Sequence, residues 1–319
     1  LHELRGGSLL VLRTADLLRV HVHLNDPEPL FSLAESWGEV VSKKAEDMRE
    51  QHRMLTAATR PVAIMTDSAC DLPDELLDRH GITVVPLQVM MGDQVFQDRV
   101  QIKAAAVYEH LRAGRTLTTS QPTVAMFSEC YELARSGAEQ VVAVILSSGL
   151  SGTYGNADSA RRVFQGGGVH VVDSKSASLG QGLLALRAAE LAEADYTPAE
   201  IGAEIERLRG QSGAFFTVAT LDYLVRSGRV SRVKGWLGNL LHMKPIFAFD
   251  DAGRVAPVDR VRGMDAVLAR VLELLDECIP AKRERLRLGV VHADAEALAR
   301  QIRDALQARF HPTEIVVSS

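Results

Sequence analysis

Four short segments of the chain are rich in hydroxyl side chains and could together bind an anion. They are residues 66–72 (TDSACDL), 116–123 (TLTTSQPT), 147–155 (SSGLSGTYG) and 173–178 (DSKSAS). Ser and Thr hydroxyls donate hydrogen bonds without adding charge, and glycines at helix N-termini leave backbone N–H groups open to an anion. The pattern therefore suits a carboxylate or a phosphate. Each hydroxyl taken alone is better explained as the cap of its own helix, whereas several such loops meeting at one edge favour an anion site.

Strands that precede these segments should bring them together. Residues 61–65 (PVAIM), 141–148 (VVAVILSS) and 169–174 (VHVVDS) are apolar runs typical of strands buried on both faces, and helical segments separate them. In an open parallel sheet, ligands bind outside the carboxyl ends of the strands. We therefore expect the loops that carry four supporting residues to meet at one edge of the sheet: Asp67, Ser68, Ser148 and Ser174. The segment 116–123 is predicted to be a further loop, leading into a helix from residue 124.

The fold class predicted is α/β with two domains. Residues 60–174 are predicted to form a mostly parallel, three-layer domain that carries the hydroxyl-rich loops. Residues 175–319 are predicted to form a second α/β domain with a mixed sheet, including a strand at 214–220 and a hairpin around the turn residues 250–253 (DDAG). Residues 1–59 contain two short strands and a helix, too little for an independent core. We expect them to belong to a domain that begins upstream of Leu1.

Ser151 raises the question of a serine hydrolase that acts on lipids. The segment Gly149-Leu150-Ser151-Gly152-Thr153 departs from the G-x-S-x-G elbow, because Thr153 stands where the second glycine belongs. His170 and His292 are candidate bases. A regulatory interaction module without a ligand is a third reading. Nucleotide-binding motifs of the P-loop and dinucleotide types are absent from the sequence.

His21 and His23 alternate in a predicted strand, so both should point to one face. Two imidazoles are half of a zinc site, and no matching third ligand accompanies them. Basic residues gather in two places, around Gly228 and after the hairpin, and could form either a solvated face or a surface for a phosphate-bearing or acidic partner. They are Arg226, Arg229, Arg232 and Lys234, then Arg254, Arg260 and Arg262.

Composition narrows the class of partner. The chain has 319 residues, of which 46% are hydrophobic, 24% charged and 5% aromatic, with a formal net charge of −5. Because the chain has no long basic run and few aromatic residues for base stacking, we expect no nucleic acid partner. Three well-separated cysteines favour a reducing compartment, and we expect a cytoplasmic protein. No stretch approaches the ~18 apolar residues of a membrane span, so transient contact with a membrane surface is the most we expect.

The chain from about residue 62 to residue 319 resembles the DegV family of fatty-acid carriers. The motifs that carry the resemblance are TDSACDLP, VVPL, FQD, TTSQPT, SSGLSGTYGNA, VVDSKSASLGQG, LDYLVRSGRVS and LGNLLHMKPI, in this order. The resemblance implies that Thr119 and Ser151 hold a fatty acid carboxylate, with Ser120 and Gly152 beside them in the head-group loops of the first domain. It also implies that the acyl chain lies in an apolar ligand tunnel between the two domains. It also implies a partner, a fatty acid kinase that makes the acyl phosphate for phospholipid synthesis. Arg262 then resembles a residue that engages this kinase, and we place Arg229 on the same surface.

Residues 19–29 (RVHVHLNDPEP) and 46–52 (EDMREQH) are similar to part of a DAK2-type fatty acid kinase. His21 and His23 then resemble two zinc ligands of that kinase, whose cysteine partner would lie upstream. The similarity implies a natural fusion of kinase and carrier, with ATP and Mg expected only in the kinase domain outside this sequence. This portion is then expected to bind lipid without being catalytic. The family also closes with a His-Thr-Gly-Pro-Gly-like loop, which would follow Ser319, so we expect an incomplete head-group site here.

Overall fold

The computed structural model describes residues 7–13, 18–23, 28–38, 60–230, 243–281, 283 and 285–319. The chain divides into two compact units, Leu1–Thr56 and Ala57–Ser319. In the first unit, β1 (Gly7–Arg13) pairs antiparallel with β2 (Leu18–His23), and α1 (Glu28–Trp37) follows. The two short strands and the helix are those predicted from the sequence. His21 and His23 lie two residues apart in β2, but their side chains lie outside the described part of the chain.

A four-stranded parallel sheet forms the centre of the second unit. Its strand order is β4-β3-β8-β9, built from β3 (Arg60–Asp67), β4 (Thr83–Val85), β8 (Ala138–Ile145) and β9 (Val169–Asp173). The three apolar runs predicted as buried strands are therefore β3, β8 and β9. Because the strands run parallel, the loops that follow these three strands leave the sheet at the same edge.

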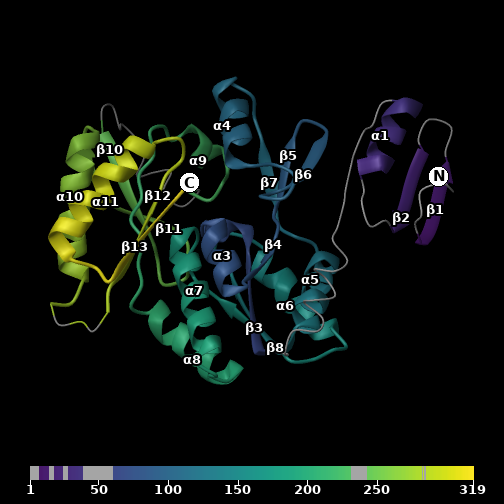
Figure 1. The fold of residues 1–319 in the computed structure, drawn as a ribbon. Helices are drawn as coiled ribbons and strands as arrows, with labels where there is room; N and C mark the ends of the chain where they lie inside the picture. Colours follow the sequence, from purple (N-terminus) through teal and green to yellow (C-terminus); the bar gives the residue numbers. More distant parts are fainter. Residues whose placement is uncertain are drawn as a thin grey trace. The chain divides into compact units, whose positions relative to one another are not determined.

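Helices cover both faces of this sheet (Figure 1). The helices α5 (Val124–Ser136) and α6 (Thr153–Val163) pack on one face, where Met65, Ala143 and Ile145 meet Phe127 and Tyr131. The opposite face packs against α3 (Asp74–His80), α7 (Leu179–Glu193) and α8 (Pro198–Arg209). Successive strand side chains point to opposite faces, so these continuous apolar runs supply both cores. The predicted boundary at residues 174/175 stays a prediction, and the segment that follows it supplies α7 and α8.

A second, three-stranded sheet lies beyond β4. It is antiparallel with order β6-β5-β7, from β5 (Gln88–Met91), β6 (Gln94–Gln97) and β7 (Thr118–Ser120). The short helix η1 (Ser68–Cys70) follows β3, and α4 (Ala104–Arg112) lies between β6 and β7. The sequence predicted one strand over 82–91. The structure divides it into β4 and β5 at Pro86, because proline has no N–H for a strand ladder.

The remainder of the second unit is α/β with two small sheets. The strands β10 (Met243–Phe249) and β11 (Val255–Arg262) form the predicted hairpin, and α9 (Asp222–Arg226) precedes them. After α10 (Met264–Cys278), β12 (Arg287–Val291) pairs parallel with β13 (Glu314–Ser318) across α11 (Glu296–Phe310). The predicted strand at 214–220 was wrong, since only Phe216 makes a bridge, to Phe247 of β10. An apolar run can line a cavity without pairing in a sheet, and several residues of this segment do so.

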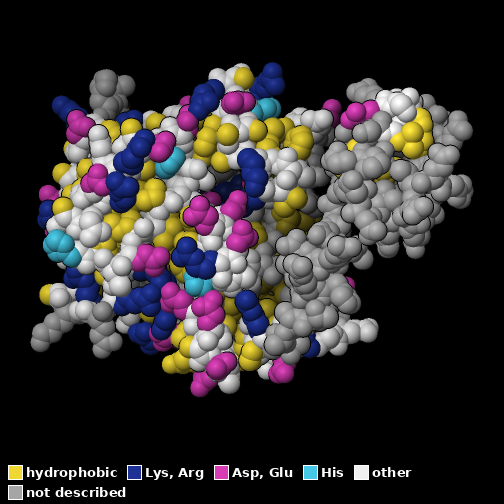
Figure 2. Space-filling model, viewed as in Figure 1, with side chains coloured by type: hydrophobic (Ala, Val, Ile, Leu, Met, Phe, Trp, Pro, Cys, Tyr) yellow, Lys and Arg dark blue, Asp and Glu magenta, His cyan; other side chains and the backbone are white. Residues whose placement is uncertain are grey.

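Charges of both signs are interspersed over the face of the unit Ala57–Ser319 that Figure 2 shows. Such interleaving is typical of a solvated surface rather than of a phosphate-binding stripe. Among the helices that the structure describes, none combines the length and apolar character needed to cross a membrane.

Candidate functional site

A pocket of about 340 Å³ brings together the two segments that the sequence singled out first. Thr119 and Ser120 from β7 and Ser151 from the loop after β8 lie on its wall. Arg229, predicted to contact a kinase, also lines it. The other lining residues are mostly apolar: Leu87, Gln121, Leu146, Leu150, Phe216, Leu224, Ser227, Phe249 and Val255.

Thr119 belongs to a strand, not to the loop that the sequence predicted. It pairs with Val89 of β5, so the antiparallel ladder fixes its backbone. A three-residue strand between a glycine-containing turn and a Gln-Pro pair carries little local signal, and its partner lies some thirty residues upstream. The Thr119 side chain is exposed, and among the described residues none exchanges a hydrogen bond with its hydroxyl. The hydroxyl can therefore bind a ligand without breaking an internal bond.

Close packing joins the Thr119 segment to the start of α6. A Cβ on Gly152 would lie 2.9 Å from Nε2 of Gln121, so the amide of Gln121 lies where a side chain would stand. The Asn156 side chain adds a hydrogen bond from Nδ2 to the Pro122 carbonyl, 2.8 Å long. Gly152, predicted to bind the carboxylate, is the N-cap residue of α6 and supports this contact without lining the pocket.

Ser151 is held in a tight turn by its neighbours. Its backbone N–H donates to the Ser147 carbonyl at 3.2 Å, and its Oγ lies 2.8 Å from Oγ1 of Thr153 and accepts from the Thr153 N–H at 3.3 Å. When Thr153 Oγ1 also donates, Ser151 keeps its own proton for a ligand oxygen. Capping and ligand binding are thus compatible. Among the described residues, no histidine is hydrogen-bonded to Ser151, whose Oγ contacts only the hydroxyl and the N–H of Thr153 there.

The apolar wall of the pocket is formed by residues that the sequence analysis did not single out. Phe216 lies with its ring centroid 5.4 Å from that of Phe247 and 5.7 Å from that of Phe249. Leu150, from the turn that carries Ser151, packs against this aromatic group. In the sequence these residues are indistinguishable from core residues. The sequence feature that could have drawn attention to them is the apolar segment 214–220 together with the alternating Phe-Ala-Phe of the hairpin.

Asp67 and Ser68 lie behind the pocket and hold its backbone in place. Asp67 is fully buried and accepts hydrogen bonds from the Leu146 N–H at 2.7 Å and from Nε2 of Gln181 at 3.0 Å. Burial raises the pKa of Asp67 to about 6, although these hydrogen bonds oppose the rise. The Ser68 Oγ accepts from the Leu87 N–H at 3.0 Å. Both predicted supporting residues therefore fix residues of the pocket wall.

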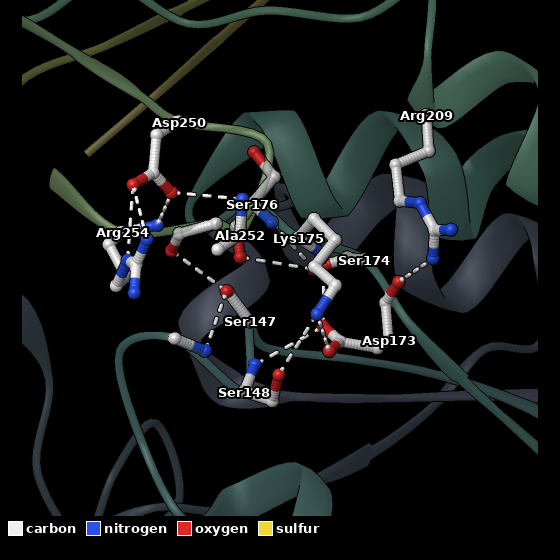
Figure 3. A network of polar contacts seen from close by, with 12 residues as sticks. Ser147, Ser148, Asp173, Ser174, Lys175, Ser176, Arg209, Asp250, Ala252 and Arg254 are labelled. Carbon is white, nitrogen blue, oxygen red and sulfur yellow. Dashed lines mark hydrogen bonds and ion pairs between the residues drawn. The ribbon is translucent and has the colours of Figure 1, made fainter. Parts of the chain in front are cut away.

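Ser148 and Ser174 belong to a polar network between the loops after β8 and β9 (Figure 3). Asp173 accepts from the Ser148 N–H at 3.2 Å, and its carboxylate lies 2.9 Å from Nζ of Lys175, which also reaches Ser148 Oγ at 3.2 Å. Burial raises the pKa of Asp173, but these bonds outweigh it and hold the pKa below its ordinary value. Ser174 Oγ donates to the Ser176 carbonyl at 3.0 Å. Neither serine lines the pocket, and both serve the loops around it.

Arg229 and Arg262 do not share a pocket. Arg229 donates to the Ser227 carbonyl at 2.9 Å, whereas Arg262 lines a second pocket of about 530 Å³ together with Lys244. Their joint role as a kinase contact stays a prediction, and the residues between Val230 and Met243 lie outside the described residues. Within the described ranges, no cluster of three or more His, Cys, Asp or Glu could hold a metal ion. The predicted zinc half-site at His21 and His23 stays untested because their side chains are not described.

Two protein families match different parts of the sequence. Residues 61–319 match the family described as "Uncharacterised protein, DegV family". Residues 1–55 match a family of FakA-like middle domains, which belong to fatty acid kinase. The two matches meet near the division between the two compact units.

Individual relatives match the second part. The protein DegV of Bacillus subtilis is 33% identical over 255 residues, which cover 79% of this chain and 90% of that protein. A DegV domain-containing protein of Deinococcus radiodurans is 42% identical over 213 residues, covering 66% of this chain and 75% of that protein.

Solved structures agree in fold. A fatty-acid-binding DegV family protein from Thermus thermophilus superposes with a TM-score of 0.72 at 35% identity, covering 81% of this chain and 92% of that one. DegV of Bacillus subtilis, described as a fatty acid binding protein, gives 0.73 at 31% identity, covering 82% and 92%.

Proposed function

Because the chain belongs to the DegV family, we propose that it binds a long-chain fatty acid and presents the carboxylate to a fatty acid kinase. The kinase would transfer a phosphoryl group from ATP to that carboxylate, and the acyl phosphate would feed phospholipid synthesis in the cytoplasm. Two family members, from Thermus thermophilus and Bacillus subtilis, are described as binding fatty acids.

The observation that carries the proposal is the combination of hydroxyl and apolar side chains in the lining of one 340 Å³ pocket. Thr119, Ser120 and Ser151 supply the hydroxyls, and Phe216 and Phe249 supply aromatic rings. Ligand pockets typically have volumes of about 300–1,000 Å³ with mostly apolar walls and a few polar groups. A carboxylate joined to an alkyl chain has the same combination.

The two kinds of side chain would contribute differently to binding. Burying an acyl chain stabilises the complex by roughly 0.8 kcal/mol per CH₂, so a chain of ~16 carbons gains on the order of 10 kcal/mol before the cost of association. Neutral hydroxyls add orientation but no cationic clamp, and a carboxylate that they hold stays nucleophilic toward ATP. Affinity would therefore come from the tail and orientation from the head-group residues.

The kinase part of the proposal rests on residues 1–55, which resemble the middle domain of a fatty acid kinase. We propose that the kinase domain is joined to the carrier in one polypeptide or binds it as a separate chain. In this proposal Arg229, an exposed residue that lines the pocket, would contact the nucleotide-bearing partner.

Mass spectrometry of lipid extracted from the protein, purified without added fatty acid, tests the binding step. We expect one equivalent of a long-chain acid. A protein without lipid that also fails to bind added palmitate would contradict the proposal. The kinase step is tested by supplying a fatty acid kinase and ATP and measuring acyl phosphate. Ser151→Ala should form it more slowly than the matched control Ser159→Ala, whose hydroxyl bonds only to Gly155 on the exposed side of α6.

A further inference from the structure

Ser147 does not line the pocket, but it connects two segments that do, the turn of Ser151 and the hairpin. It is fully buried and lies two residues after the end of β8. Its carbonyl accepts the N–H groups of Leu150 at 3.0 Å and of Ser151 at 3.2 Å, which closes the turn that carries both pocket residues. Its Oγ accepts the Gly149 N–H at 3.0 Å and donates to the Gly253 carbonyl at 2.8 Å. These two hydrogen bonds of the hydroxyl therefore connect the turn to the hairpin (Figure 3).

Gly253 lies in the turn of the hairpin, which is held by hydrogen bonds among its own residues. The Asp250 carboxylate accepts the N–H groups of Ala252 and Arg254, each at 2.9 Å, and lies 3.1 Å from the Arg254 guanidinium. The Gly253 N–H donates to the Asp250 carbonyl at 2.7 Å. On either side of this turn, β10 ends at Phe249 and β11 begins at Val255, and both residues line the pocket. A displacement of the turn would thus displace both residues.

Two glycines allow the turn and the hairpin to approach this closely. A Cβ on Gly149 would lie 2.4 Å from the Ala252 carbonyl oxygen. A Cβ on Gly253 would lie 2.0 Å from Ser147 Oγ and 2.9 Å from the Lys175 Cα. The backbone of Gly253 also has φ of +70°, which side-chain-bearing residues rarely adopt. The contact is therefore built from both sides and does not rest on one hydrogen bond.

We propose that Ser147 is a positioning residue for the ligand's carboxylate, acting through its hydrogen bonds to Gly149 and Gly253. The inference rests on the proposed function and deepens it. The Ser147 hydroxyl sets the distance between the Ser151 hydroxyl and the apolar residues of the hairpin. The carboxylate is therefore held in one position relative to its alkyl chain. Loss of the hydroxyl leaves the tail bound and lets the head group sample several positions.

The test is NMR of the full chain with bound palmitate that carries ¹³C either at the carboxyl carbon or at the terminal methyl. In the wild type we expect one narrow bound resonance from each label. In Ser147→Ala the carboxyl resonance should broaden or split and move toward the position of free palmitate. The methyl resonance should stay in place. Ser147→Gly removes the same hydroxyl without adding any atom and should give the same pattern, so the test does not depend on one variant folding.

Ser128→Ala is the matched control, because its partly buried hydroxyl also donates to a backbone carbonyl, that of Val124, away from the pocket. It should leave both resonances unchanged. An unchanged carboxyl resonance in Ser147→Ala and Ser147→Gly would overturn the inference, as would equal changes in both labels, which indicate general loosening. Absence of bound resonances in the wild type would instead refute fatty acid binding itself.

Discussion

Thr119→Val tests the hydroxyl side chains of the pocket most directly, because it removes a hydroxyl and keeps the shape of the side chain. Valine suits a strand at least as well as threonine, and Thr119 is exposed and pairs with Val89 through its backbone alone. The folded state should therefore be nearly unaffected. Any change in ligand affinity then measures the hydroxyl.

The expected magnitude follows from the bonding of that hydroxyl. Among the described residues it has no partner, so a carboxylate would gain a full hydrogen bond from it. A hydrogen bond to a charged group contributes about 1.5–3 kcal/mol, and each 1.4 kcal/mol is tenfold in affinity. Thr119→Val should therefore weaken palmitate binding by about 10- to 150-fold. The tail contacts remain, so binding should stay measurable.

Isothermal titration with palmitate gives the dissociation constant, and thermal unfolding checks that the fold is intact. Thr118→Val is the matched control, since the neighbouring residue of β7 points to the opposite face and does not line the pocket. A loss below about threefold in Thr119→Val, or an equal loss in Thr118→Val, would refute the assignment of the carboxylate to this hydroxyl.

Three further predictions concern residues around the pocket. Thr153→Val removes the hydroxyl that bonds to Ser151 at 2.8 Å, and should weaken palmitate binding in the same titration by less than Thr119→Val does. Phe216→Ala should lower the free energy of unfolding in urea by about 2 kcal/mol, less than for a fully buried phenylalanine, and should reduce the lipid that copurifies. Because burial raises the pKa of Asp67 from 3.8 to about 6, the folded state binds the proton more tightly than the unfolded state does. The stability that this proton contributes is present below about pH 4 and is lost as the pH rises through about 6. In urea titrations, the free energy of unfolding of the wild type should therefore fall by roughly 1 kcal/mol relative to that of Asp67→Asn between about pH 5 and about pH 7.5. A rise relative to Asp67→Asn would contradict the sign.

The central sheet was predictable because its signal is local. Apolar runs such as 61–65 and 141–148 are long enough to mark strands, and the hydroxyl loops after β3, β8 and β9 then follow from parallel topology. The segment that carries Thr119 was assigned correctly to the site and wrongly to a loop. Its strand exists because β5 is beside it, and pairing with a distant partner leaves no periodic trace in a three-residue strand.

The apolar wall and the Ser147 contact lay beyond the reach of the sequence. Phe216 carries the same apolar signal as any core residue, and only tertiary structure decides whether an apolar side chain packs in a core or lines a cavity. Ser148 was singled out while its neighbour Ser147 makes the closer connection, because the two are equivalent in sequence. Both follow the end of β8, where no strand periodicity distinguishes them, and the decisive partner, Gly253, is 106 residues away.

The separation of Ser147 and Gly253 in the sequence decides when, during synthesis, the contact between them can form. Chains fold as they leave the ribosome, N-terminal parts first, and contacts between distant residues form late. The parallel sheet has all its strands once Asp173 has emerged, and the Ser151 turn can form with it. The hairpin ends only at Arg262, so the Ser147 hydroxyl cannot bond to the Gly253 carbonyl until the chain has been made to about that residue. A ligand that needs both sets of pocket residues can bind only a chain that extends beyond the hairpin, and its binding energy stabilises no shorter precursor.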